Sequence, residues 1–359
     1  MLKINNYALD RGGAERNHLV DVIKGVCILF VIFSHYAWSD EQRHKMLFPF
    51  WIDMAVPMFM VVSGYVGALS FYNKKIENLK DCFLINSIMA KCARFMLPFT
   101  VAFLFEFLLD AFLSKSFSFK RYIVSFFYGG EGPGNYYIPI MIQFVFLFPF
   151  IYFIVRRYGF FGALIIFFAN AAYEFFQRLY GVNERCYRLL LLRYVFAISF
   201  GCYLSVYKDE IIKKIWLCAS FLIGLGFIFL VEYTSYEPKI IVYWTRTSFL
   251  ACLYLVPIAY VILKRDLKFG LAPLELLGKA SFNIFLTQMV YYFLFSDLVY
   301  GCIQNQYVRI IVNTLVCCAF GVLFYHIESP VTKKLIKRIN SLDINIANKI
   351  NSVFLRRTK

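Results

Sequence analysis

The sequence predicts an all-α integral membrane protein: a polytopic bundle of about ten transmembrane helices with both termini in the cytoplasm. Of its 359 residues, 60% are hydrophobic and 20% aromatic, but only 17% are charged, whereas soluble domains carry roughly 25% charged residues. In addition, apolar stretches recur along the whole chain, each close to the ~20 helical residues that cross a bilayer. The formal net charge of +16 therefore concerns membrane topology rather than nucleic acid, which we do not expect as a partner.

Ten apolar stretches account for nearly all of the chain between its charged ends. They are residues 19–38, 47–71, 95–113, 136–155, 159–176, 189–207, 215–232, 247–263, 281–300 and 307–326. The third and fifth are short or interrupted by charge. An even number of crossings returns the C-terminus to the side of the N-terminus.

The distribution of Lys and Arg gives the orientation, because these residues accumulate in short cytoplasmic loops. With the N-terminus inside, the inner segments hold 25 of the 38 Lys and Arg residues and the outer loops hold 11. Lys24 and Arg193 remain within predicted helices. The bias places both termini in the cytoplasm.

The chain divides into one large unit and a tail. Residues 1–330 predict a single transmembrane domain, since no long loop or linker interrupts the bundle. Residues 331–359 interleave basic with apolar side chains, which is typical of a helix on an anionic membrane surface. A solvated tail that only fixes topology fits this composition equally well. Membrane lipids are expected partners in either case.

The first predicted helix carries three ionisable residues on one face: Asp21, Lys24 and His35. Charged groups inside a membrane span are costly, so they indicate a functional site. Lys24 and His35 are eleven residues apart, which is three helical turns and a rise of about 16 Å. The lysine then lies near the cytoplasmic end and the histidine near the outer end, a separation comparable to an extended pantetheine arm.

Matching depths across the first outer loop places Asp53 level with His35, where a carboxylate would orient the imidazole. The same matching places Ser63 and Gly64 near Lys24, and this pair of small residues permits close helix approach. The remaining polar residues of the spans fall into two zones. Lys91 and Arg94 lie at inner ends, where a basic pocket suits a phosphorylated ligand. The outer zone, whose carboxylates, Arg and Tyr suit a sugar, contains Glu106, Asp110, Tyr137, Glu174 and Arg193.

Several segments, in order, resemble the membrane acyltransferase 3 family, whose members O-acylate sugars and cell-envelope glycans. Asp21-x-x-Lys24-Gly25, followed by an apolar run to His35, is similar to the family's first helix. Five later segments resemble further motifs of the family, in the same order along the chain. They are Ser63-Gly64-Tyr65, Lys91-x-x-Arg94 with Pro98, Tyr137 with Pro149, Leu277-Gly278 with Ser281 and Asn283, and Glu328-x-Pro330. Two positions depart from the family pattern: Gln288 stands where members often have His, and Tyr137 where Trp is common.

The resemblance implies a membrane-embedded O-acyltransferase, most simply an O-acetyltransferase of a bacterial plasma membrane. Acetyl-CoA would be the donor substrate, held by Lys24, Lys91 and Arg94, with no bound cofactor and no metal. His35 would be the general base, with Asp53 as its orienter, and the acyl-histidine route stays open. Ser63, Asn283 or Gln288 would stabilise the oxyanion. The acceptor would be a sugar hydroxyl of a surface glycan or lipid-linked saccharide.

Two other functions remain open from the residues. A transporter or flippase for lipid-linked saccharides has similar helices and mid-membrane charges, but it does not require Lys24 and His35 on one face. A glycan polymerase would use a lipid-linked sugar as its donor. The sequence does not indicate an oligomeric state.

Overall fold

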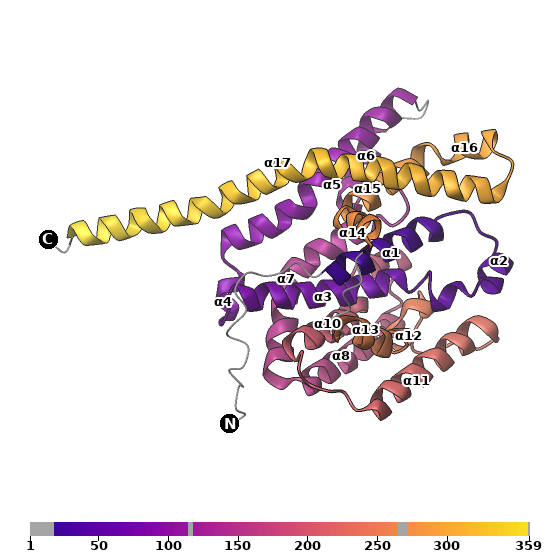
Figure 1. Ribbon diagram of the computed structural model, residues 1–359, viewed down its shortest axis with the longest axis horizontal. Helices are drawn as coiled ribbons and strands as arrows, with labels where there is room; N and C mark the ends of the chain where they lie inside the picture. The colour runs from indigo at the N-terminus through magenta and orange to yellow at the C-terminus, as the bar shows by residue number, and fades with distance from the viewer. Residues whose placement is uncertain (1–17, 114–117, 265–270, 358–359) are drawn as a thin grey trace.

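The computed structural model describes residues 18–113, 118–264 and 271–357, and the side chains of these ranges as far as residue 341 (Figure 1). Every regular element within these ranges is a helix. The first half of the chain forms α1 (His18–Ser34), α2 (Asp40–Lys45), η1 (Phe48–Phe50), α3 (Ala55–Asn73), α4 (Leu79–Cys82), α5 (Ile85–Leu113), α6 (Phe119–Tyr128), α7 (Tyr137–Tyr158) and α8 (Phe160–Tyr180).

The second half forms shorter and more often interrupted helices, apart from α11 and the last one. They are α9 (Glu184–Arg188), η2 (Leu191–Tyr194), α10 (Val195–Val206), α11 (Lys214–Tyr233), η3 (Thr245–Thr247), α12 (Phe249–Cys252), α13 (Leu255–Lys264), α14 (Ala272–Lys279), α15 (Ser281–Leu294), α16 (Ser296–Cys302) and α17 (Gln306–Arg357). The all-α polytopic fold predicted from composition is confirmed.

Each of the ten predicted stretches contains helix, but the helices differ in their capacity to cross a membrane. Six are long and apolar enough among the described residues, and there are eight if two bent pairs each count as one span. The pair Thr245–Cys252 and Leu255–Lys264 bends by 61°, and the pair Ser281–Leu294 and Ser296–Cys302 by 62°. The helix Leu191–Val206 and the 17-residue α1 are shorter. The count of ten spans and the cytoplasmic termini remain predictions.

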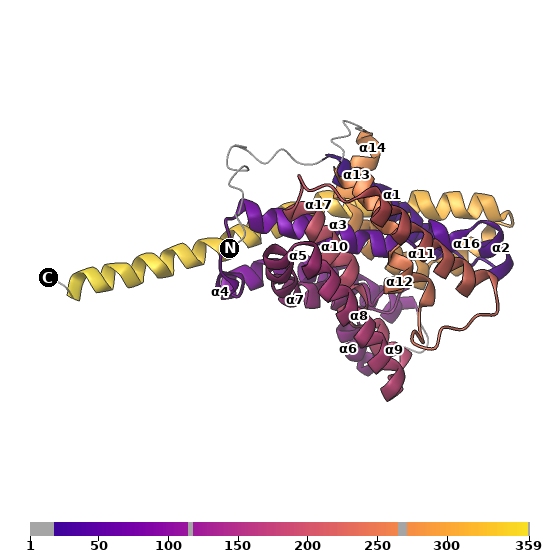
Figure 2. The ribbon, with the colours of Figure 1, turned by 90° about the horizontal axis from the view of Figure 1, so that it is seen from below.

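The last helix continues well past the stretch 307–326. α17 has 52 residues and includes Pro330, so at 1.5 Å per residue it is roughly 78 Å long. It runs without a break through residue 330, the predicted end of the transmembrane domain, and its C-terminal part projects from the bundle (Figures 1 and 2). Of the basic membrane-surface helix predicted for residues 331–359, the side chains of residues 342–359 lie outside those that the structure describes.

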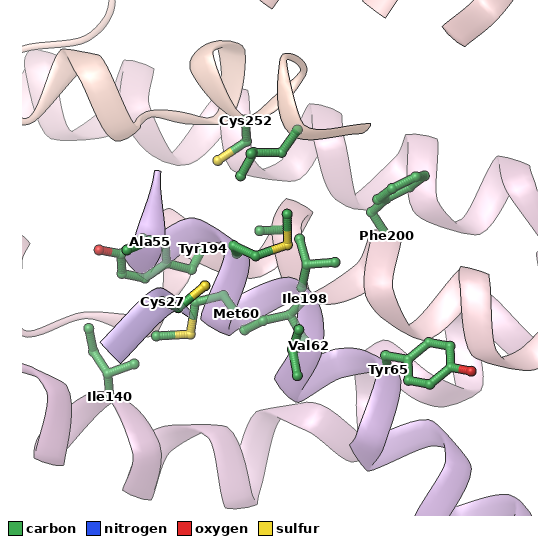
Figure 3. Packing of buried hydrophobic residues seen from close by; sticks show 14 of the residues in the cluster. Cys27, Ala55, Met60, Val62, Tyr65, Ile140, Tyr194, Ile198, Phe200 and Cys252 are labelled. Atoms are coloured by element: carbon green, nitrogen blue, oxygen red, sulfur yellow. The ribbon is translucent and has the colours of Figure 1, made fainter. Parts of the chain in front are cut away.

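The short α1 lies inside the bundle, where it packs against α3, α14, α15 and α17. Figure 3 shows the apolar core beside it, with Cys27 of α1 near Met60 of α3 and Ile140 of α7. On α3, a Cβ at Gly64 would overlap the carbonyl oxygen of Ile198 in α10. Gly64 thus allows a close helix approach, and the partner is α10.

The outer surface is apolar, the reverse of a soluble protein. Large exposed hydrophobic side chains include Phe105 and Phe112 on α5, Ile215 and Trp216 on α11, and Leu315 on α17. Exposed apolar surface on this scale indicates contact with lipid. Several charged side chains are buried inside the bundle instead, among them Asp21, Glu106, Asp110, Glu174 and Arg193.

Candidate functional site

A cavity of about 290 Å³ runs along α1, where it is lined by Lys24, Ile28 and Val31. These residues follow one another at three- or four-residue spacing and so form one face of the helix. His35, four residues after Val31, continues the same line just beyond the last turn of α1, which ends at Ser34. The cavity therefore extends from the lysine along the face that leads toward the histidine, which is not itself among the lining residues.

The three predicted donor-binding residues line this one cavity together. Lys91 and Arg94 reach it from one face of α5, since they are three residues apart on that helix. Lys24 lies 3.9 Å from Asp21, and the Lys91 ammonium lies 4.9 Å from the centre of the Phe71 ring. Three cations in a cavity otherwise lined mainly by apolar side chains make a site for an anionic group attached to an apolar chain.

Two further predicted residues, Ser63 and Tyr137, line the same cavity. Ser63 thus lines the same cavity as Lys24, the residue with which depth matching grouped it. Tyr137 was predicted in the outer, acceptor-binding zone, but it lies in the cavity that holds the cations, with its ring 4.9 Å from Phe285. Tyr137 is the first residue of α7, and its ring packs against α15 beside this cavity.

A second cavity, of about 780 Å³, adjoins the first. The two share Lys24, Arg94, Phe95, Ser281 and Phe282, and the second extends between α14, α15 and α17. Asn283, a predicted oxyanion donor, lines this second cavity, and its side-chain amide donates to Glu328 at 3.2 Å. Asn283 is thus placed with the basic end of the site rather than beside His35.

The imidazole of His35 is held by Gln288 of α15. The His35 Nδ1 lies 2.8 Å from Gln288 Oε1, and Gln288 Nε2 donates to the carbonyl oxygen of Pro133 at 3.2 Å. Because this orients the amide with its oxygen toward the ring, Nδ1 is the protonated nitrogen and Nε2 carries the lone pair. A histidine in this tautomer is prepared to accept a proton at Nε2.

The glycine-rich segment after α6 lies against the same histidine. Gly134 has a φ of +87°, and a Cβ built on it would lie 3.4 Å from His35 Cε1 and 3.0 Å from the Phe285 ring. Only glycine adopts this backbone conformation at little cost. The run of glycines was the signal that this segment packs closely, but nothing in the sequence indicated against what.

Asp53 does not contact the imidazole in the structure. Its carboxylate accepts from Arg43 at 2.8 Å and lies 3.5 Å from Arg246, which is also 3.3 Å from Glu232. The orienting partner of His35 is therefore Gln288, and the expectation that Asp53 fills this place is corrected. Equal depth in a membrane does not bring two side chains together, because they can face different neighbours.

The remaining predicted acceptor residues lie in two separate places. Glu106 and Asp110 are buried on α5, where Glu106 accepts from the backbone N–H of Glu131 at 3.3 Å. This carboxylate is 3.9 Å from a Cβ position on Gly130, so it flanks the glycine-rich segment that reaches His35. Arg121 pairs with Glu131 at 3.0 Å beside it.

Glu174 and Arg193 are elsewhere, each 1% exposed. Glu174 accepts from the hydroxyl of Tyr187 at 2.8 Å, and Arg193 donates to the hydroxyl of Tyr194 at 2.8 Å. Aromatic rings surround the guanidinium, within 6.0 Å of their centres: Tyr136, Tyr187, Tyr194 and Trp244. The structure thus divides the predicted sugar-binding set among three sites.

At the basic end, His18 and Lys279 both approach Glu275 of α14, at 2.8 and 3.6 Å. The hydrogen bond with His18, together with the nearby positive charge, holds the pKa of the Glu275 carboxyl below its usual range. Within the described residues, no group of three His, Cys, Asp or Glu side chains is arranged to hold a metal ion.

Comparison with known proteins gives the family of the chain. A family model described as an acyltransferase domain matches residues 17–326, which include α1, both cavities' shared residues and Gln288. Searches of curated proteins and of solved structures found no match. The family model covers far more than half of the chain, which therefore belongs to the membrane acyltransferase 3 family.

Proposed function

We propose that this membrane acyltransferase moves an acetyl group from acetyl-CoA, bound from the cytoplasm, to a sugar hydroxyl of a cell-surface glycan or lipid-linked saccharide. The observation that carries the proposal is the cavity along α1, which joins Lys24, Lys91 and Arg94 to the neighbourhood of His35. We further propose that the protein is a multi-pass component of a bacterial plasma membrane, with about ten spans.

The donor enters at the basic end. Lys24, Lys91 and Arg94 bind its phosphates through charge-assisted hydrogen bonds, and the acyl-pantetheine arm lies along Ile28 and Val31 toward His35. The distance suits the arm, because the eleven residues from Lys24 to His35 rise about 16 Å. Tyr137 belongs to this donor path, since it lines the same cavity.

His35 acts as the general base. Its Nε2 takes the proton of the acceptor hydroxyl as the hydroxyl oxygen attacks the thioester carbonyl carbon. The tetrahedral intermediate then collapses, the carbon–sulfur bond breaks, and the coenzyme A thiolate leaves with the proton from the imidazolium. None of the three predicted oxyanion donors is assigned, because Gln288 is engaged by His35 and Pro133, Asn283 is engaged by Glu328, and Ser63 belongs by helix depth with Lys24, about 16 Å from His35.

A covalent route through an acyl-histidine makes a distinct prediction. Incubation with acetyl-CoA but no acceptor would add one acetyl mass to the intact protein, and His35→Ala would abolish that addition. With His35 as base only, the protein mass stays unchanged until acceptor is supplied.

The acceptor reaches His35 from the side of the glycine-rich segment, where Glu106 and Asp110 supply hydrogen-bond acceptors for sugar hydroxyls. This places acceptor chemistry on the outer side of the membrane. Glu174 and Arg193, enclosed by aromatic rings, are assigned to holding α8 and η2 together.

Two experiments test the proposal. Mass spectrometry of the surface glycan from a deletion strain should show the loss of one acetyl mass per modified residue, and an unchanged glycan would overturn the assigned acceptor. Coenzyme A should raise the melting temperature of the purified protein. The increase should be smaller in Arg94→Ala, and in the control Arg178→Ala it should equal that of the wild type. A transporter or polymerase of lipid-linked saccharides would show no such shift.

A further inference from the structure

The second cavity has a wall that lies outside the residues matched by the family model. That match ends at residue 326, whereas α17 lines the cavity with Glu328, Ser329, Thr332, Lys333, Ile336, Lys337, Asn340 and Ser341. These positions recur every three or four residues, so they form one continuous face of the helix over about four turns. The wall is thus a feature of this chain that the family match does not assign.

This cavity is strongly basic. Its lining includes Lys24, Arg94, Lys279, Lys333 and Lys337, against two carboxylates, Asp21 and Glu328. The adjoining first cavity is lined mainly by Phe, Val, Ile and Met side chains. A ligand that fills both must therefore carry several negative charges at one end and a slender, largely apolar arm at the other.

The volumes fit a ligand of nucleotide size at the basic end. Ligand pockets measure roughly 300–1,000 Å³, and the basic cavity of about 780 Å³ falls in this range, whereas the inner one is about 290 Å³. The narrower cavity leads toward His35. The wider one is the place for the bulkier, charged portion of the ligand.

A buried polar contact holds this face of α17 in position. Glu328 is 7% exposed and accepts from the Asn283 amide of α15 at 3.2 Å and from the hydroxyl of Thr332, one turn further along. Lys333 follows Thr332 directly, and Lys337 lies one turn beyond. Their ammonium groups are therefore carried by a helix that is locked to the bundle, not by a loose tail.

We propose that α17, through Lys333 and Lys337, supplies the part of the donor site that binds the nucleotide phosphates of an acyl-CoA. The inference rests on the proposed function, because it takes an acyl-CoA as the donor. It assigns the 3′-phosphate and the adenosine-side phosphate of the diphosphate to Lys279, Lys333 and Lys337, while Lys24, Lys91 and Arg94 hold the pantetheine-side phosphate and the start of the arm. The first part of the predicted surface tail then belongs to the enzyme's donor site.

The test compares two donors, acetyl-CoA and S-acetyl-pantetheine, which lacks the nucleotide and its phosphates. Lys333→Ala with Lys337→Ala should lower the preference for acetyl-CoA, measured as the ratio of the two kcat/KM values, by about tenfold or more, through the KM for acetyl-CoA. The matched control is Lys334→Ala with Arg338→Ala, which removes the same charge from neighbouring positions that do not line the cavity. The control should keep the wild-type preference.

A variant that binds the donor more tightly is also needed, because misfolding could explain a loss in the double variant but not a gain. Asn340 lines the same face of the cavity, so Asn340→Lys adds a cation there and should lower the KM for acetyl-CoA. Equal preference in wild type, double variant and control would overturn the assignment of α17. A wild-type protein that transfers no acetyl group from either donor would instead overturn the proposed function.

The lipid composition separates nucleotide phosphate from lipid phosphate. The assays are run in phosphatidylcholine nanodiscs and in nanodiscs with added phosphatidylglycerol. If Lys333 and Lys337 bind the nucleotide, the loss in the double variant persists in phosphatidylcholine alone. A loss that appears only with phosphatidylglycerol would show that the lysines bind an anionic headgroup, and it would overturn the inference.

Discussion

The imidazole Nδ1 of His35 lies 2.8 Å from the amide oxygen of Gln288. The residues are 253 positions apart, on the turn after α1 and in the middle of α15. Because the amide nitrogen of Gln288 is committed to the carbonyl of Pro133, the contact selects the tautomer in which Nε2 is free to accept a proton. The neutral amide of Gln288 thus orients the imidazole and fixes its tautomer, a role that a carboxylate commonly has elsewhere, and it adds no charge to the bundle.

Removing the acceptor from Gln288 should impair the base. In Gln288→Leu the imidazole loses its partner and its fixed tautomer, so we expect kcat to fall by about tenfold or more, equivalent to ~1.4 kcal/mol. Gln288→Glu keeps an oxygen at this position and should retain more activity. Equal kcat in Gln288→Leu and wild type, from acetyl transfer by purified proteins, would show that the contact does not serve catalysis.

An added methyl group at Gly134 should disturb the same site from the other side. In Gly134→Ala the Cβ meets Phe285 at 3.0 Å and His35 at 3.4 Å, at a φ of +87°, which costs an L-residue roughly 1 kcal/mol or more. We expect lower kcat with little change in the KM for the donor. Gly181→Ala, at another positive φ but with nothing within 4 Å, is the control for strain alone.

Replacing Asp53 separates the two roles considered for it. Its side chain is 7% exposed and joins Arg43 to Arg246, so Asp53→Asn should lower the free energy of unfolding by about 1–3 kcal/mol and leave kcat near wild type. Thermal unfolding and acetyl transfer are measured on the same preparation. A large fall in kcat at unchanged thermal stability would restore Asp53 to the catalytic centre.

The docking of α14 on α1 should depend on pH through Glu275. The pKa of this carboxyl is held below its ordinary value of about 4.5, so its contribution to stability is fully present above that value and is lost as the pH falls through the lowered pKa. Glu275→Gln should be less stable than wild type at pH 7, and the difference should disappear as the pH falls below about 4. A difference in melting temperature that is independent of pH would contradict this.

Periodicity and length were enough to predict the helical bundle and the line of residues from Lys24 to His35. Both follow from spacing within one helix, which the sequence displays directly. That Lys24, Lys91 and Arg94 line one cavity was also predictable, because the sequence places all three at the inner ends of their spans. The bends near Leu253 and Phe295, and the continuation of α17 past Pro330, depend on packing between distant segments and left no clear local signal.

The interaction partners of the buried polar groups were harder to predict from the sequence than the helices were. Depth along a helix can be counted from the sequence, but the direction in which a side chain points relative to other helices cannot. Counting residues along the helices gives Asp53 the same depth as His35, but its carboxylate forms ion pairs with Arg43 and Arg246 instead. Arg193 likewise faces Tyr136 and Trp244, which come from segments more than 50 residues away on either side. No pattern within a single helix reveals such an enclosure.

Acetyl transfer from labelled acetyl-CoA to surface glycan, measured with the purified protein in nanodiscs, tests the role of His35 most directly. Wild type should label the glycan, and His35→Ala should lose at least 99% of the rate, given the 10²–10⁴-fold contribution of a general base, while still being stabilised by coenzyme A. Label transferred by His35→Ala at a rate near that of wild type would contradict the mechanism.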